Sequence, residues 1–241
     1  MARFFAGTSG WAYPTWKPEF YPAKLAQKKF LGHYSTQLNT VEVNFTFRQL
    51  VKETTIQNWL QDTPAHFRFG IKAHQVITHI KRLKGTEDFV RRFLATIEPL
   101  AAAGKLGPVL FQLPPNLKAD SALLKDFLAI LPRTVPAAFE FRHASWFNDS
   151  TWDLLKENNV ALCVAETETL TTPEVATAGF IYYRFRKPSY SGEERGSMID
   201  RIGLHVAAGR DVFAYFKHEE TPEGALYAVE LLREVSGARG S

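Results

Sequence analysis

The chain has 241 residues, of which 45% are hydrophobic and 22% charged, so its composition is that of an ordinary globular protein with ample apolar material for a core. The net charge of +4 permits an anionic partner but does not demand one. There is no run of about 18 uncharged apolar residues, and the start MARFFAGTSGW is too short an apolar run for a signal peptide. Because the single cysteine, Cys163, cannot form an internal disulfide and lies in the apolar run VALCV, we expect a buried, inert thiol. We therefore expect a soluble, cytoplasmic protein with no membrane span.

Short apolar runs alternate with longer amphipathic ones along the whole chain. In chain order, strands are expected at residues 4–9, 40–45, 67–73, 107–113, 137–142, 160–166, 180–186 and 211–217. Helices are expected at 24–38, 52–62, 86–103, from the N-cap Asp120, at 149–158, at 198–208 and from the N-cap Thr221. The third helix is the clearest, because Phe89, Phe93 and Ile97 recur at helical spacing.

Eight strands, nearly all followed by a helix, predict a parallel sheet, and eight such units in this length fit a single (β/α)8 TIM barrel over residues 1–241. The segment 167–179, between the sixth and seventh strands, is poor in helix signal and is expected to be irregular. Residues 236–241 are expected to form a flexible tail. The alternative is an open doubly wound sheet, which usually carries a glycine-rich phosphate turn after its first strand. The turn here, GTSGW, matches neither the dinucleotide fingerprint nor a P-loop.

Polar side chains interrupt the apolar strands near their carboxyl ends, where a barrel carries its functional site. These residues are Glu42 and Asn44, Lys72 and His74, Gln112, Glu140 and Arg142, Glu166, Arg184 and Arg186, and Lys217. Side chains in a strand alternate between its two faces. In the second, third, fifth and seventh strands, the two polar residues of each pair lie on the same face. In the third strand Gly70 lies on that face too, and its lack of a side chain leaves space there. We therefore expect most of them to converge at one end of the lumen.

The charges of this predicted ring favour an anionic ligand. Five cations (Lys72, Arg142, Arg184, Arg186 and Lys217) stand against three carboxylates (Glu42, Glu140 and Glu166). The loop RKPSYSGEERGS after the seventh strand adds Lys187, hydroxyls and glycines, and loops at this position hold a phosphate in many barrels. Two alternatives stay open: a buried ion-pair network that merely fills the barrel, and a loop that is simply solvated.

Aromatic side chains accompany the cations. Trp11 follows the first strand and Trp146 the fifth, and both could stack on bases or sugar faces or merely pack over the barrel.

Four histidines, His74, His79, His143 and His218, lie at or beyond strand ends, yet no HExxH motif or cysteine–histidine pair appears, and the local cations oppose a divalent ion. No Ser-His-Asp arrangement is recognisable either, because GTSG around Ser9 is not a nucleophile elbow. We predict no cofactor and no metal site, with a divalent ion as the less favoured alternative.

Several long motifs resemble the domain of unknown function 72 family, also called YecE-like. They are GTSGW, FYP, EVNFTF, GIKAHQVITH, LGPVLFQLPP and FEFRHASWF, and the resemblance runs from residue 5 to about residue 232. The residues that match are Gly10, Trp11, Glu42, Lys72, Thr78, His79, Gln112, Pro114, Glu140, Arg142 and Trp146. The resemblance implies a TIM barrel of bacteria or archaea and implies no particular activity. This chain departs from the family with YFKHEE after the eighth strand, RFRK after the seventh and Glu166 where aspartate is common.

Two functions fit these residues. The first is an enzyme, a hydrolase or isomerase acting on a phosphorylated or nucleic-acid substrate, with Glu42 or Glu140 as general acid or base and Lys72 and Arg142 stabilising charge. Its substrate-binding residues would be Trp11, Asn44, His74, His79, Gln112, Trp146, Glu166, Arg184, Arg186 and Lys217. The second is a non-catalytic binding protein for a nucleotide, oligonucleotide or sugar phosphate. The expected partner is thus an anionic small molecule or single-stranded nucleic acid.

Overall fold

A computed structural model describes residues 2–166, 170–217 and 220–237. The strands are β1 (Phe4–Thr8), β2 (Thr40–Val43), β3 (Arg68–Lys72), β4 (Leu106–Gln112), β5 (Ala137–Glu140), β6 (Ala161–Ala165), β7 (Phe180–Phe185) and β8 (Asp211–Phe216). The α-helices are α1 (Phe30–Gln37), α2 (Glu53–Asp62), α3 (Glu87–Ala102), α4 (Ser121–Ile130), α5 (Asp149–Glu157), α6 (Gly192–Ala207) and α7 (Glu223–Gly237). Short helical turns are η1 (Pro14–Trp16), η2 (Gln27–Lys29), η3 (Phe45–Phe47), η4 (Val76–Ile80) and η5 (Ala144–Trp146), of which η4 is a π-helix.

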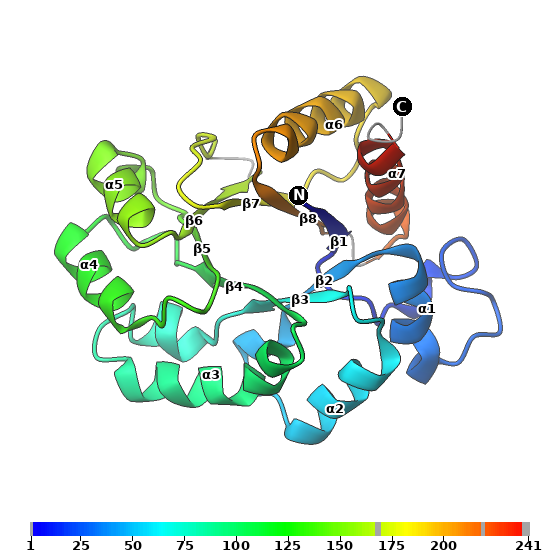
Figure 1. Ribbon diagram of the computed structural model, residues 1–241, viewed down its shortest axis with the longest axis horizontal. Coiled ribbons are helices and arrows are strands. Elements are labelled where there is room, and N and C mark those ends of the chain that lie inside the picture. The colour runs from blue at the N-terminus through cyan, green and yellow to red at the C-terminus, as the bar shows by residue number, and fades with distance from the viewer. Residues whose placement is uncertain (1, 167–169, 218–219, 238–241) are drawn as a thin grey trace.

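The strands form one parallel sheet in the order β1-β8-β7-β6-β5-β4-β3-β2, and the helices lie outside it (Figure 1). The two end strands meet, because Ser9 forms a bridge with Glu42 and the Gly10 N–H donates to the Glu42 carbonyl oxygen at 2.9 Å. This nearly closed ring confirms the predicted TIM barrel and excludes an open doubly wound sheet.

The seam between β1 and β2 is closed by one tyrosine and one glycine. Tyr34 Oη accepts a hydrogen bond from the Thr8 N–H and donates to the Thr40 carbonyl oxygen, each at 2.9 Å. A Cβ on Gly7 would lie 2.0 Å from the same Thr40 oxygen, which is closer than atoms can approach. Only glycine therefore lets the two strands come together here.

Apolar side chains fill two layers. The larger layer lies between the strands and the helices, and a smaller cluster fills the lumen. In the lumen, the rings of Phe5 and Phe213 stack with centroids 4.5 Å apart. Cys163 also lies there, fully buried, so the expected buried thiol is confirmed, and burial raises its pKa well above the usual value.

The segment after β7 differs from its prediction. Helix α6 begins at Gly192 because Ser191 and Glu194 form a capping box, so the second half of the expected anion-binding loop is helical. Lys187, expected to contribute to that loop, pairs instead with Glu194, with Nζ and Oε1 2.7 Å apart.

Two other expectations concern irregular segments. Residues 166 and 170–179, between β6 and β7, contain no helix, as predicted, and this segment lies between α5 and α6 (Figure 1). Helix α7 continues through Gly237, so the first two residues of the expected tail are helical, and 238–241 lie outside the described residues. Within the described ranges, no helix combines the length and apolar character needed to cross a membrane.

Candidate functional site

Glu140, the last residue of β5, is fully buried at the carboxyl end of the barrel. Its Oε1 accepts from Gln112 Nε2 at 2.9 Å, and its Oε2 accepts from Arg184 Nη1 at 2.6 Å. Arg186 Nη2 donates to both oxygens at 3.0 Å. The carboxylate is therefore held by donors from the strand ends of β4 and β7.

Glu42 in β2 is held in the same way on the other side of the lumen and is also fully buried. Its Oε1 accepts from Ser9 Oγ at 2.8 Å, Asn44 Nδ2 at 3.1 Å and Arg184 Nη2 at 2.7 Å. Its Oε2 accepts from Tyr182 Oη at 2.6 Å. Arg184 thus bridges two carboxylates and links β2 to β5 across the barrel.

These contacts join into one chain of hydrogen bonds, which we call the mouth network. Its members are Ser9, Glu42, Asn44, Lys72, Gln112, Glu140, Tyr182, Arg184 and Arg186. They come from β1, β2, β3, β4, β5 and β7 or the residues that directly follow them, as expected from the strand-end pattern. The glycine expected to leave room does so, because a Cβ on Gly70 would lie 2.6 Å from Tyr215 Oη.

Both carboxyl groups of the network are held ionised. Burial alone would raise the pKa of each, but the Arg184 guanidinium and the hydrogen bonds outweigh burial. With Arg186 adding a second positive charge, the pKa of Glu140 falls to about 2, and that of Glu42 is also lowered. Neither carboxylate can then exchange a proton near neutral pH, which argues against the expected role of Glu42 and Glu140 as general acid or base.

Lys72, the last residue of β3, has a different environment. Its Nζ donates to Gln112 Oε1 at 2.9 Å and lies 4.4 Å from the centre of the Phe47 ring. Burial, followed by the positive charge of Arg184, lowers its pKa to about 8, although Glu42 and Glu140 partly oppose this. Lys72 is therefore the network member whose charge changes closest to neutral pH.

Arg142 and His79 lie at the edge of the network. Arg142 Nε is 4.0 Å from Glu140 Oε1, and its side chain is 37% exposed. His79 contacts Thr78 Oγ1 at 2.8 Å and meets the Phe47 ring edge-on. Burial and the charges of Lys72 and Arg142 lower the pKa of His79, so its imidazole is favoured in the neutral form.

The mouth also carries polar atoms and charge that the protein does not satisfy. In the described part of the chain, the side chains of Lys72, Arg142, Arg184 and Arg186 gather around the carboxylates of Glu42 and Glu140. A third carboxylate, Glu166, accepts from the Arg186 N–H at 3.3 Å, so the four cations exceed the neighbouring carboxylates by one positive charge. Among the described residues, Arg186 Nε and Asn44 Oδ1 are buried without a hydrogen-bond partner. Buried polar groups ordinarily find a partner, so such atoms point to a ligand or water at the mouth.

Three predicted site residues are not members of the mouth network. Trp146 is fully buried, stacks on Phe141 and donates its Nε1 to the Leu117 carbonyl oxygen, so its ring has no surface for a ligand. His74 is buried, and its Nδ1 accepts from the Val76 N–H at 3.1 Å, which makes it part of a local turn.

Glu166 is the third. In β6 the lumen positions are Ala161, Cys163 and Ala165, so Glu166 has the opposite parity. It accepts from Tyr190 Oη and from the Arg186 N–H, the latter at 3.3 Å, and it borders a hollow of about 330 Å³ beside α6. Glu166 therefore lies at the edge of the mouth network and not among the side chains that fill it.

Trp11 follows β1 and Lys217 follows β8, and neither is a member of the mouth network. Trp11 is half-buried with its ring edge-on to Trp59. Lys217 is exposed, and its N–H donates to the Phe185 carbonyl oxygen at 2.9 Å. Their role in binding stays a prediction.

Three contributors were missed from the sequence: Tyr182, Phe47 and Ser9, whose hydroxyl donates to Glu42. Tyr182 has the same parity as Arg184 in the run FIYYRFR, so the alternation rule could have identified it. Phe47 lies in η3 after β2, and no strand pattern could have placed it beside Lys72.

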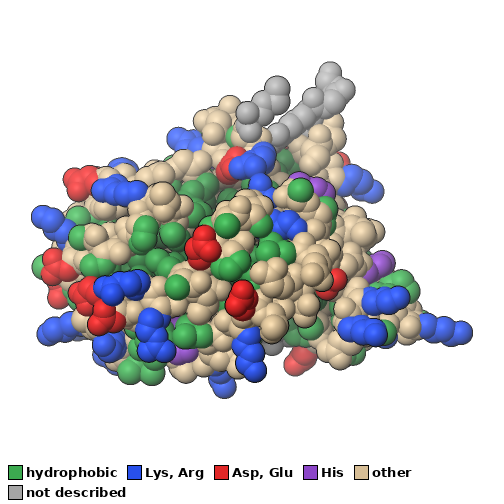
Figure 2. Space-filling view, turned by 60° about the horizontal axis from the view of Figure 1, so that its bottom comes forward, with side chains coloured by type: hydrophobic (Ala, Val, Ile, Leu, Met, Phe, Trp, Pro, Cys, Tyr) green, Lys and Arg blue, Asp and Glu red, His purple; other side chains and the backbone are tan. Residues whose placement is uncertain are grey.

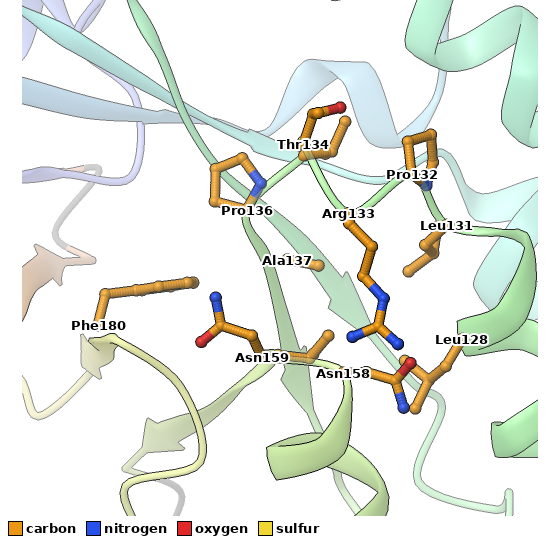
Figure 3. A pocket seen from close by; sticks show the side chains of 12 residues that line it. Leu128, Leu131, Pro132, Arg133, Thr134, Pro136, Ala137, Asn158, Asn159 and Phe180 are labelled. Atoms are coloured by element: carbon orange, nitrogen blue, oxygen red, sulfur yellow. The ribbon is translucent and has the colours of Figure 1, made fainter.

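Two further features, possible metal ligands and a cavity, lie outside the mouth network. In the part of the chain that the structure describes, no three His, Cys, Asp or Glu residues are grouped to hold a metal ion. His143 contacts Ser145, and His218 lies outside the described residues. A cavity of about 150 Å³ lies at the opposite end of the barrel, lined by Arg133, Asn158, Asn159 and Phe180 among others (Figure 3). Residues at that end of a TIM barrel usually serve stability.

The positive charge of the chain is not gathered into one surface patch on the face drawn in Figure 2. Lysine and arginine side chains lie dispersed around that face, with acidic side chains among them.

Comparison with known proteins identifies the family. The sequence matches the family described as "Protein of unknown function DUF72" over residues 5–240. The chain belongs to this family. It is 29% identical over 150 residues to the UPF0759 protein YunF of Bacillus subtilis, covering 60% of this chain and 52% of that one. It is 30% identical over 144 residues to the UPF0759 protein YecE of Escherichia coli K12, covering 59% and 50%. The matches thus span about half the length of these curated relatives.

A solved DUF72 structure shares the fold. The crystal structure of a DUF72 protein of Thermotoga maritima superposes with a TM-score of 0.82 at 23% identity, covering 99% of this chain and 100% of that one. The barrel and the family are therefore established together.

Proposed function

We propose that this DUF72 protein is an enzyme that binds a phosphoryl group of its substrate at the barrel mouth and acts as a hydrolase or isomerase. The observation that carries the proposal is the excess of positive charge around carboxylates that are already saturated. A phosphoryl group would neutralise that excess and accept from Arg186 Nε. The same site could take a small phosphorylated molecule or a phosphate of a single-stranded nucleic acid.

Lys72 is the group we assign to proton transfer. Its pKa of about 8 allows it to give up and take back a proton near neutral pH, which Glu42 and Glu140 cannot do while Arg184 holds them. In this scheme the two carboxylates orient Arg184 and Arg186, and the arginines stabilise negative charge that develops on the substrate.

A non-catalytic binding protein is the second candidate. The saturation of both carboxylates favours it, because it leaves Lys72 alone among the network's ionisable side chains to transfer protons. Turnover that is lost in Lys72→Met while ligand binding is only weakened would favour the enzyme. Steep salt dependence of binding would favour a polynucleotide over one small anion.

Melting temperature against inorganic phosphate, sugar phosphates, nucleotides and short single-stranded DNA and RNA tests the proposal. A ligand at about 100 times its dissociation constant should stabilise by about 2.7 kcal/mol, which is about 5–10 °C for a chain of this size. Arg186→Gln should lower the affinity about tenfold or more, because it removes a charged donor from the mouth.

Arg133→Gln is the matched control, since Arg133 lies at the opposite end of the barrel and donates to the Glu157 carbonyl oxygen. It should leave the ligand-induced shift unchanged. Equal loss in both variants, or no response to any phosphorylated ligand, contradicts the proposal.

A further inference from the structure

Among the described residues, three lysines are buried or half-buried: Lys17, Lys72 and Lys105. Lys17 lies in the loop after β1 and donates to the Leu25 carbonyl oxygen at 2.6 Å, whereas Lys72 is the last residue of β3 and Lys105 directly precedes β4. Lys105, only 7% exposed, donates to the Leu60 and Thr63 carbonyl oxygens and to Thr63 Oγ1, at 2.9, 2.6 and 3.1 Å. All three ammonium protons therefore have an acceptor, as expected of a structural lysine. Lys72 has one acceptor within the described residues, Gln112 Oε1, and the Phe47 ring as its other neighbour.

The mouth network also keeps its carboxylates away from Lys72. Glu140 is occupied by Gln112, Arg184 and Arg186, and Glu42 by donors that include Arg184 and Tyr182. Gln112 stands between Lys72 and Glu140, so the amine meets a neutral amide oxygen in place of a carboxylate. No carboxylate of the described residues comes within ion-pair distance of Lys72 Nζ, although Glu140 is only one side chain away.

Such surroundings suit an amine that reacts as a nucleophile. A lysine that is desolvated and set beside other cations loses its proton more easily, and the neutral amine is the form that attacks carbonyl carbon. Its pKa of about 8, compared with an ordinary 10.5, makes the neutral fraction at pH 7 about 300 times larger. Arg142 Nε and Arg186 Nη2 lie 4.0 and 3.0 Å from Glu140 Oε1, the oxygen that also accepts from Gln112. Both arginines are therefore near the hydrogen-bond partner of Lys72, where they can hold an anionic end of the same molecule.

We propose that Lys72 forms an imine with its substrate, and that the substrate is a small phosphorylated aldehyde or ketone. The Nζ lone pair forms a bond to the carbonyl carbon, the carbonyl oxygen takes up two protons and leaves as water, and a C=N bond replaces C=O. No oxidant or reductant is needed. The protonated imine draws electrons from the adjacent carbon and eases removal of a proton there, as an isomerase requires. This inference rests on the phosphoryl site proposed above.

Reductive trapping tests it. The protein is incubated at pH 7 with glyceraldehyde 3-phosphate or dihydroxyacetone phosphate and sodium cyanoborohydride, and peptide mass spectrometry measures adduct at each lysine. Lys72 should react at least about ten times faster than exposed Lys84, and Lys105 should stay unmodified. Unphosphorylated glyceraldehyde should need about tenfold higher concentration for the same occupancy of Lys72. Lys72→Arg should remove the adduct from its peptide, whereas Lys84→Arg should leave trapping at Lys72 unchanged.

The thermal response of the wild-type protein to inorganic phosphate separates the two proposals. Stabilisation by phosphate with no preference for Lys72 in trapping overturns the imine and leaves the phosphoryl site standing. Preferential trapping that is equal for glyceraldehyde and its phosphate supports the imine and overturns the phosphorylated class. The absence of both responses overturns both proposals.

Discussion

The two halves of the barrel lumen are built from different chemistry. The lower half, which we call the lumen floor, contains Phe5, Phe180, Phe213 and Ala161, and its rings meet at centroid distances of 4.5 and 6.0 Å. The upper half is the mouth network, where Glu42 and Glu140 are 0% exposed and Arg184 is 3% exposed. The floor is filled by apolar groups, whereas the mouth buries charged ones.

The difference indicates what each half is for. Burial of apolar surface stabilises the fold by about 25 cal/mol per Å² without needing a partner, so a contribution to stability is enough to explain the lumen floor. Removing a charge from water costs several kcal/mol, and an apolar replacement of a buried ion pair is often neutral or stabilising. The excess positive charge and the unpartnered atoms of the mouth network are therefore the features on which the proposed ligand site rests.

The largest expected effect comes from removing the charge that joins the network. In Arg184→Met, Glu42 and Glu140 both lose a guanidinium contact and stay buried. We expect a loss of about 3–5 kcal/mol in the free energy of unfolding at pH 7, measured by urea denaturation.

Arg142→Met is the control, because its ion-pair distance is 4.0 Å and its side chain is 37% exposed. It should cost less than about 1 kcal/mol. If Arg184→Met also changed stability by less than that, the carboxylates would not depend on Arg184.

The next largest effect is the pH dependence of the free energy of unfolding, to which the mouth network should contribute and the lumen floor should not. The folded-state pKa of Glu140, about 2, lies below its unfolded value of 4.5, so its contribution is present above pH 4.5 and is lost as the pH falls toward 2. The full contribution is about 3 kcal/mol, of which about 1.4 kcal/mol should be lost by pH 3.5.

Glu140→Gln should remove that part of the pH dependence, whereas Phe213→Ala, in the lumen floor, should destabilise by about 3–5 kcal/mol with the wild-type pH dependence retained. Urea denaturation of wild type, Glu140→Gln and Phe213→Ala at pH 3.5 and pH 6 measures this loss of unfolding free energy. Parallel acid profiles for wild type and Glu140→Gln would show that Glu140 is not held ionised.

The smallest effect concerns the space that the network and the floor share. A Cβ on Gly70 would lie 2.6 Å from Tyr215 Oη, which contacts Thr40 Oγ1 at 2.9 Å. Gly70→Ala should therefore cost about 1–3 kcal/mol through overpacking. Thermal unfolding measures this cost, with Gly196→Ala as the control. Gly196 lies in α6, where an added Cβ would meet nothing within 4 Å, so alanine should stabilise the protein by up to about 1 kcal/mol there. A Gly70→Ala protein as stable as wild type would mean that Tyr215 moves freely.

The sequence by itself determined the strands and most of the mouth. Eight apolar runs separated by amphipathic ones specify a parallel barrel, because each strand must be covered by a helix on its outer face. Parity within a strand then placed Glu42, Lys72, Gln112, Glu140 and Arg184 in the lumen, since alternate side chains point to opposite faces.

The alternation rule could not assign a face to each residue of β6, because its sequence does not alternate between apolar and polar residues. The run VALCVAE is apolar at successive positions, so nothing in it shows that Cys163 and not Glu166 faces the lumen. Trp146 is the last residue of a short turn, η5, and donates to the Leu117 carbonyl oxygen. Only the packing of neighbouring loops decides such a position.

Tertiary structure alone decided which charges neutralise one another. Arg184 lies 142 residues from Glu42 and 44 from Glu140 along the chain, and closure of the barrel brings its guanidinium between them. That arrangement occupies both carboxylates and leaves Lys72 with an amide oxygen. The pKa of each group, and hence the chemistry available at the mouth, follows from distances and burial that no local sequence pattern specifies.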